Sequence, residues 1–258
     1  MRFDVITLFP ELFTPFLQHG INRRAFEGGL VDVRLWNPRD FAEGNYRRVD
    51  DRPFGGGPGM VMMAEPLWLC LQAVRAERAE PDDARAPVVL FSPIGQTLQH
   101  ASVERWSQSQ GAVLLCGRYE GIDQRFIDAC VDVQISLGDF VLSGGEIAAM
   151  ALLDAVARLQ PGVLNDQGSH QQDSFNPALD GLLDSPHHTR PEVWQGPAGP
   201  MPVPEVLLGG HHERIARHRR EQSLLLTARQ RPELLQRARE QGLLDAADQR
   251  FLRARGLL

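Results

Sequence analysis

Two glycine-punctuated loops near the middle of the chain have the residue types that a cofactor pocket needs. The first loop follows a β-rich run that ends at Cys116, and the second precedes an apolar helical pattern that begins at Glu146. Their glycines are Gly117, Gly121, Gly138, Gly144 and Gly145. Glycine permits tight turns at strand ends and leaves backbone N–H and C=O groups accessible. Because ligands of open α/β sheets bind at such strand ends, we predict a cofactor pocket here.

The surrounding sequence predicts the elements that position these loops. Alternating or continuous apolar runs predict strands over residues 2–8, 30–36, 88–91, 112–116, 131–137 and 140–142. Helical spacing predicts a helix opening at Pro10 and others over residues 66–79, 100–110, 146–159, 212–229, 232–241 and 245–255. A long polar loop is predicted over 37–59, and a turn over 92–95. This β-α-β alternation favours an α/β fold with a mainly parallel sheet.

The chain changes character after residue 160. Residues 161–176 are polar and rich in helix breakers, which is typical of a flexible interdomain linker. The expected organisation is a cofactor-binding domain over 1–160 and a small, mostly helical domain over 177–258.

Charge is distributed unevenly along the 258 residues. Residues 209–258 hold 11 Arg and 6 acidic residues, a net charge of +5, whereas residues 1–208 hold 16 Arg and 27 acidic residues, a net charge of −11. A basic helical tail on an acidic body raises the expectation of nucleic-acid binding. The chain has no Lys, and Arg offers a planar fork suited to phosphates and guanine edges.

Several other classes of protein are disfavoured. No apolar run approaches the ~18 residues of a membrane span, so a cytosolic protein is expected. The three cysteines lack the paired spacing of a zinc site, so we expect reduced thiols and no metal. The Gly55–Gly59 cluster lacks the Lys-Ser/Thr of a phosphate loop, and no Gly-x-Gly-x-x-Gly follows the first strand. Nucleoside triphosphate hydrolysis and hydride transfer are therefore disfavoured.

Ordered matches along most of the chain carry a family resemblance. They cover residues 4–11, 50–60, 116–121, 138–146, 173–175 and 189–192. In these segments the chain resembles the TrmD family of bacterial tRNA (guanine-N1)-methyltransferases, members of the SPOUT class. The resemblance implies a deep trefoil knot in the α/β domain and an obligate homodimer with its active site at the subunit interface. It also implies methyl transfer from S-adenosylmethionine to N1 of guanosine 37 of tRNA, just 3′ of the anticodon.

By the same resemblance, specific residues receive roles. Asp173 is the expected general base, and Arg158 is expected to stabilise charge that develops on guanine O6. From the residues alone, Asp173 is also an ordinary linker residue, and Arg158 also suits the negative end of a helix. The expected cofactor-binding residues are Ser92, Pro93, Gly117, Tyr119, Glu120, Leu137, Gly138, Asp139, Phe140, Val141, Leu142, Gly144 and Gly145. The expected substrate-binding residues are Asp50, Asp51, Gly57, Gly59, Arg214 and Arg220.

Three positions depart from the family pattern. Gln172 precedes the expected base where an acidic residue is common, Phe140 replaces a frequent Tyr, and residues 196–204 resemble a small insertion. Two alternative functions remain open. One is a SPOUT methyltransferase that modifies another RNA position, and the other is a non-catalytic RNA-binding protein.

Overall fold

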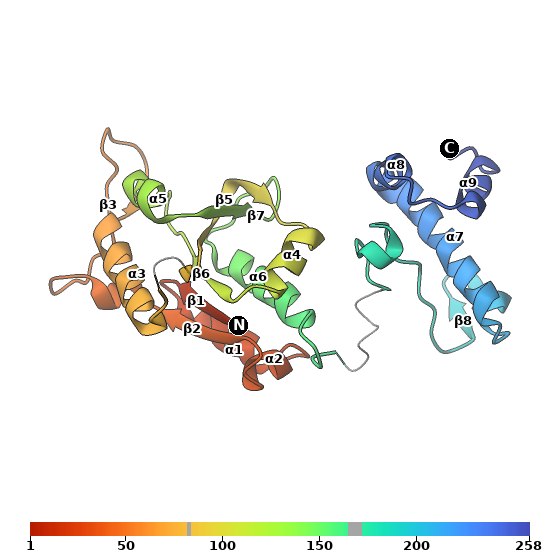
Figure 1. Ribbon diagram of the computed structural model, residues 1–258, viewed down its shortest axis with the longest axis horizontal. Helices are drawn as coiled ribbons and strands as arrows, with labels where there is room; N and C mark the ends of the chain where they lie inside the picture. The colour runs from red at the N-terminus through yellow and green to blue at the C-terminus, as the bar shows by residue number, and fades with distance from the viewer. Residues whose placement is uncertain (82–83, 165–171) are drawn as a thin grey trace. The chain divides into compact units, whose positions relative to one another are not determined.

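The computed structural model describes residues 1–81, 84–164 and 172–258. The chain divides into two compact units, Met1–Asn165 and Asp166–Leu258 (Figure 1). The domain boundaries predicted at residues 160 and 177 stay predictions, and residues 165–171 of the predicted linker lie outside the described residues. Within the described ranges, no helix is long and apolar enough to cross a membrane.

The first unit is built on a five-stranded sheet in which all neighbouring strands run parallel. In spatial order its strands are β2 (Asp32–Trp36), β1 (Arg2–Ile6), β6 (Gly111–Leu115), β5 (Val88–Thr97) and β7 (Val133–Ser136). The carboxyl ends of the strands therefore meet at one edge of the sheet. The predicted α/β fold with a mainly parallel sheet is confirmed, whereas the trefoil knot stays a prediction.

Helices cover both faces of this sheet. Successive side chains of a strand point to opposite faces, so the apolar residues of one strand contribute to two separate clusters. Phe3 and Val5 of β1 join one apolar cluster, and Ile6 joins the other. The first cluster includes residues of α1 (Phe13–Gln18), α2 (Arg23–Glu27), α4 (His100–Ser107) and α6 (Glu146–Arg158). The second includes residues of α3 (Ala64–Arg78) and α5 (Gln124–Cys130). Strand β6 is buried along its whole length, which explains its continuous apolar sequence.

Strand β5 leaves its ladder with β7 and then rejoins it. Val89–Phe91 pair with Val133–Ile135, and Gln96 and Thr97 pair with Ile135 and Ser136. The residues between, Ser92–Gly95, form an irregularity inside β5, so the strand continues where the sequence predicted its end at Phe91 and a turn over 92–95. A Cβ atom at Gly95 would lie 2.5 Å from backbone atoms of Gln134 and Ile135, so this close approach requires glycine.

Some local predictions are wrong or incomplete. The predicted strand over 140–142 is a loop, and Phe140 and Val141 remain 54% and 84% exposed instead of pairing in the sheet. The predicted helix at Pro10 begins as the 3-10 helix η1 (Pro10–Leu12), which leads into α1. The long polar loop contains η2 (Pro38–Phe41) and β3 (Asp50–Asp51), which pairs with β4 (Val61–Met62). Helix α5 was not predicted, because seven residues give little helical periodicity.

The second unit contains a β-hairpin besides its helices. The hairpin consists of β8 (Val193–Gly196) and β9 (Gly199–Pro202), and two 3-10 helices, η5 (Pro177–Leu179) and η6 (Glu205–Leu207), flank it in the chain. The helices are α7 (His212–Gln230), α8 (Pro232–Glu240) and α9 (Ala246–Arg253). They share an apolar cluster that includes Leu182, Leu224 and Leu252. The sequence pattern over residues 196–204 indicates only a small insertion, so it does not predict the two strands of the hairpin.

Candidate functional site

A cavity of about 250 Å³ opens beside the irregular part of β5, where β6 and β7 end. Three segments from separate parts of the sequence form its wall: the start of the Ser92–Gly95 irregularity, the loop after β6, and the loop between β7 and α6. The predicted cofactor residues that line it are Ser92, Pro93, Gly117, Tyr119, Glu120, Leu137, Phe140, Val141, Leu142, Gly144 and Gly145. The fold therefore gathers most of the predicted cofactor residues around one cavity.

Gly138 and Asp139 are the predicted cofactor residues that do not line this cavity. Gly138 has φ 147°, and its N–H donates to Ser136 Oγ at 3.1 Å. Ser136 Oγ in turn donates to the Gly138 carbonyl at 3.1 Å. These bonds turn the chain from β7 into the cavity loop, so Gly138 shapes the wall without being part of it. Ligand contacts of both residues stay predictions.

The remaining wall is mostly apolar and was not predicted. Its apolar side chains are Leu90, Phe91, Ile122, Ile127, Ile135 and Ala148. Phe140 and Val141 leave large apolar side chains open to solvent at the same cavity. Such an exposed apolar surface is expected where a ligand or a partner molecule covers it.

The loop after β6 is fixed to the glycine cluster of the long polar loop. The Glu120 N–H donates to the Met60 carbonyl at 2.9 Å, and the Met62 N–H donates to the Gly121 carbonyl at 2.9 Å. A Cβ atom at Gly59, where φ is 76°, would collide with the Glu120 side chain. Gly59 therefore supports the cavity wall directly. Gly57 lies in the exposed part of the same cluster.

Tyr119 connects the cavity with β3. Burial, followed by the nearby Asp50 carboxylate, raises the pKa of the Tyr119 phenol. Arg39 Nη2 donates to Tyr119 Oη at 3.3 Å, a neighbour that the sequence did not single out. Asp51 points elsewhere: it is exposed, and its Oδ1 accepts from the Arg52 N–H at 2.8 Å. Of the predicted acidic pair, Asp50 is the one beside the cavity.

A buried carboxylate at the start of α6 braces the cavity wall. Glu146 is 1% exposed, and its Oε1 accepts from Thr7 Oγ1 at 2.8 Å and from Arg118 Nε at 3.1 Å. Arg118 Nη2 lies 2.8 Å from Glu146 Oε2, and Arg118 Nη1 donates to the Ser143 carbonyl at 3.1 Å. We call Thr7, Arg118, Ser143 and Glu146 the pocket-side cluster. Sequence reasoning missed its charged pair, although a Glu opening an otherwise apolar helix is a usable signal.

The two predicted catalytic residues belong to different units. Arg158 is the last residue of α6, and Asp173 lies in the turn before η5; both are half-buried. The Asp173 carbonyl accepts from the Asn176 N–H at 3.3 Å, and the Asp184 N–H donates to Ser174 Oγ at 2.9 Å. Asp173 is therefore carried on a turn that is hydrogen-bonded within the second unit. The catalytic roles of Asp173 and Arg158 stay predictions.

The two predicted RNA-binding arginines have different surroundings. Arg220 Nη2 donates to Asp180 at 2.6 Å and to Asp248 at 2.8 Å, so its charge is neutralised inside the second unit. Arg214 lies exposed in the first turn of α7. In the part of the chain that the structure describes, no group of three or more His, Cys, Asp or Glu is placed to hold a metal ion.

Known proteins match the chain over nearly its whole length. The sequence profile of the family described as "tRNA (Guanine-1)-methyltransferase TrmD" matches residues 1–237. A tRNA (guanine-N(1)-)-methyltransferase of Polaromonas sp. is 73% identical over 98% of this chain and 96% of its own length. The protein of that name from Paracidovorax citrulli is 71% identical over 100% of both chains, and the one from Methylibium petroleiphilum is 63% identical over 98% of both. The chain belongs to the TrmD family of tRNA (guanine-1)-methyltransferases.

Proposed function

We propose that the protein transfers a methyl group from S-adenosylmethionine to N1 of guanosine 37 of tRNA, just 3′ of the anticodon. One observation carries the proposal: three loops that sequence analysis assigned to the cofactor line a common cavity at the carboxyl edge of the sheet. Relatives that bear the matching enzyme name cover nearly the whole chain at high identity. Because the proposed substrate is tRNA, we expect the protein to act in the cytoplasm.

The chemistry of the cavity wall supports S-adenosylmethionine as its ligand. A Cβ atom at Gly145 would lie 2.7 Å from Cys116 Cα. Glycine is therefore needed at this position for the loop before α6 to pack closely against the end of β6. Backbone groups of the loop over 137–142 are suited to pair with adenine, against an apolar wall that includes Leu90 and Ile135. The negative Glu120 carboxylate is suited to attract the positive sulfonium of the cofactor electrostatically. The bound cofactor supplies an electrophilic methyl group.

The Asp173 carboxylate takes the proton that leaves guanine N1 as the methyl group arrives. A positioned general base contributes roughly 10²–10⁴-fold to such a step. A hydrated carboxylate is a weak base for this proton, so we expect desolvation in the complex with tRNA to strengthen Asp173 as a base.

The Arg158 guanidinium stabilises the negative charge that develops on guanine O6 when N1 loses its proton. A fixed cation aimed at a developing oxyanion favours the transition state over the ground state. Arg158 ends α6, whose first residue is Glu146 of the pocket-side cluster. Helix α6 therefore runs from the cavity wall at Glu146 to Arg158, the residue proposed to stabilise the charge on guanine O6.

The tRNA contacts and the subunit arrangement complete the proposal. Asp50, beside Tyr119, is suited to accept hydrogen bonds from the guanine edge. Asp51, Gly57 and Gly59, the other proposed substrate-binding residues of the first unit, lie in the same polar loop. Arg214 is suited to bind a phosphate, whereas Arg220 also holds the second unit together through its ion pairs. We propose a homodimer with the active site at the subunit interface.

A labelling experiment tests the function. The protein is incubated with radiolabelled S-adenosylmethionine and total tRNA, and the modified nucleotide is mapped by digestion. We expect 1-methylguanosine at position 37. A methyl group at another position favours the alternative SPOUT methyltransferase, and no transfer to any RNA favours a non-catalytic RNA-binding protein.

A further inference from the structure

The β8–β9 hairpin is an exposed structure with no core of its own. Residues 186–195 are all exposed, and none of residues 186–202 is buried. A two-stranded hairpin alone is marginally stable in water. Pro200 and Pro202 also remove backbone donors from β9. The hairpin nevertheless carries three large apolar side chains that are about half exposed: Val193, Trp194 and Met201.

Trp194 is held against one face of the hairpin. It pairs in register with Met201, so the two side chains lie on the same face. A Cβ atom at Gly196 would lie 3.1 Å from Trp194 Cζ3 and 2.9 Å from Met201 Sδ. The indole therefore lies across Gly196 and beside the Met201 sulfur. With 54% of Trp194 still exposed, the supported ring presents a flat surface to solvent.

We propose that Trp194 is a stacking platform for an unpaired base of the tRNA substrate. Proteins that bind single-stranded RNA stack its bases on aromatic side chains and hold its backbone with basic ones. The inference rests on the proposed function, because it assumes that tRNA is the substrate. It adds a base contact in the hairpin, which contains none of the individual residues predicted to bind RNA, although it lies in the domain over 177–258 that the family resemblance implies to bind tRNA.

The charge around the hairpin favours RNA as the occupant. The segment that follows it, residues 209–258, has 11 Arg and 6 acidic residues. Helix α7 begins ten residues after β9 ends, and η6 between them packs against α7. Arg214 and Arg219 are exposed on α7, and Arg190 is exposed just before β8. A supported ring in a unit that also exposes several arginines matches the chemistry of an unstacked nucleotide better than that of an apolar protein surface.

Four variants and a binding titration test the platform. We expect Trp194→Ala to raise the dissociation constant for tRNA about tenfold, the size typical of losing one stacked base. Trp194→Phe keeps an aromatic face and should restore most of the affinity. Trp194→Leu keeps apolar volume without that face and should not. Val193→Ala, on the opposite face of the hairpin, serves as the matched control and should bind tRNA like the wild type.

The salt dependence separates stacking from phosphate binding. The slope of log affinity against log salt should stay unchanged in Trp194→Ala, because no phosphate contact is lost. Wild-type tRNA affinity in Trp194→Ala, or equal affinity of the Leu and Phe variants, overturns the proposal. Loss of self-association in Trp194→Ala with unchanged tRNA affinity also overturns it, since the ring then contacts a second copy. A wild-type protein that neither binds nor methylates tRNA refutes the proposed function instead.

Discussion

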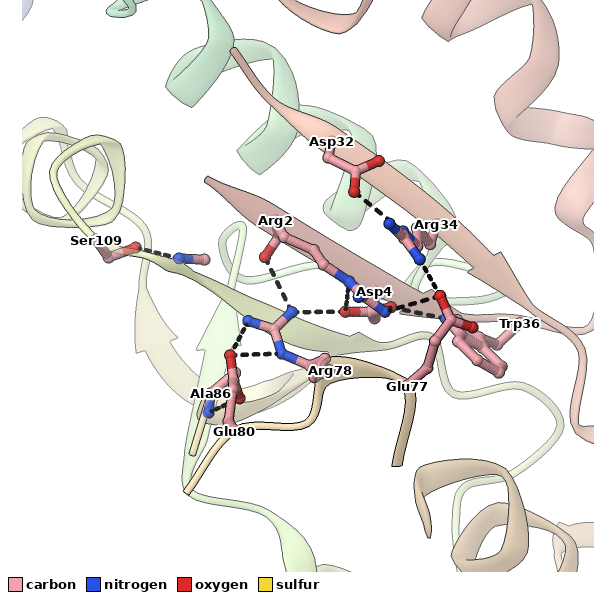
Figure 2. Close-up of polar contacts among 11 residues, drawn as sticks. Arg2, Asp4, Asp32, Arg34, Trp36, Glu77, Arg78, Glu80, Ala86 and Ser109 are labelled. Carbon is pink, nitrogen blue, oxygen red and sulfur yellow. Dashed lines mark hydrogen bonds and ion pairs between the residues drawn. The ribbon is translucent and has the colours of Figure 1, made fainter. Parts of the chain in front are cut away.

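Two buried carboxylates, Asp4 in the middle of β1 and Glu146 beside its carboxyl end, both bind arginine but have different neighbours. Asp4, at 0% exposed, accepts from Arg2 Nη2 at 2.7 Å, from Trp36 Nε1 at 2.8 Å and from Arg78 Nη1 at 2.6 Å (Figure 2). We call these four residues the Asp4 cluster. Just after the carboxyl end of the strand, Thr7 donates to Glu146 in the pocket-side cluster. Each cluster buries an acidic group against an arginine.

Strand direction explains why only one of these clusters belongs to the candidate site. None of the four Asp4 cluster residues lines the cavity, whereas Arg118 and Ser143 of the pocket-side cluster do. Ligands of open α/β sheets bind beyond the carboxyl ends of the parallel strands. Similar chemistry should therefore stabilise the fold within β1 and shape the cofactor pocket beyond its carboxyl end.

The largest expected effect on stability is that of Asp4→Asn. Arg78 is only 3% exposed, so removing its partner leaves a buried charge without full compensation. Breaking a buried pair in this way costs about 3–5 kcal/mol, of which Glu80 will offset a part. Chemical denaturation measures the loss. Glu77→Gln is the matched control, because its 44% exposed side chain should contribute no more than about 1 kcal/mol.

Measuring the affinity of Asp4→Asn for S-adenosylmethionine tests whether the Asp4 cluster also affects the cofactor pocket. The folded fraction of Asp4→Asn should bind the cofactor as the wild type does. A clear loss of affinity in this variant would show that the two clusters are not separate in function.

Glu146→Gln should have the opposite profile. The change removes the charge that holds Arg118 against the cavity wall, and we expect the dissociation constant for S-adenosylmethionine to rise about tenfold, or about 1.4 kcal/mol. Its cost in stability should be smaller than that of Asp4→Asn, because Arg118 is 19% exposed and can be partly hydrated. Calorimetric titration measures the affinity. Unchanged affinity together with a large loss of stability would make the pocket-side cluster purely structural.

The smallest expected effect is a change in acid sensitivity beside the Asp4 cluster. The hydrogen bond from Arg78 lowers the pKa of Glu80 below its ordinary 4.5. A lowered pKa in the folded state means that the carboxylate stabilises the protein above its unfolded pKa, and that this contribution is lost as pH falls through the folded value. In Glu80→Gln, the free energy of unfolding should therefore fall less steeply between about pH 5 and pH 3. An identical slope in both proteins would contradict this.

The sequence predicted those parts of the molecule that local patterns encode. Strand β6 is an apolar run because both of its faces are buried, and the glycine motifs together with the family resemblance located the segments of the cavity wall. Phe140 and Val141 were misassigned to a strand, because apolar residues of high β-propensity also occur where a ligand or partner covers them. Long-range ion pairs gave no local signal: Arg78 is 74 residues from Asp4, and Arg118 is 28 residues from Glu146.

The central claim is that the cavity binds S-adenosylmethionine while Asp173 removes the proton from guanine N1. Single-turnover methylation of tRNA by Asp173→Ala, measured together with its affinity for S-adenosylmethionine, tests this claim most directly. We predict a rate at least about 10²-fold below that of the wild type, with cofactor affinity retained. A normal rate in this variant, or a lower rate that saturating cofactor restores, would contradict the account.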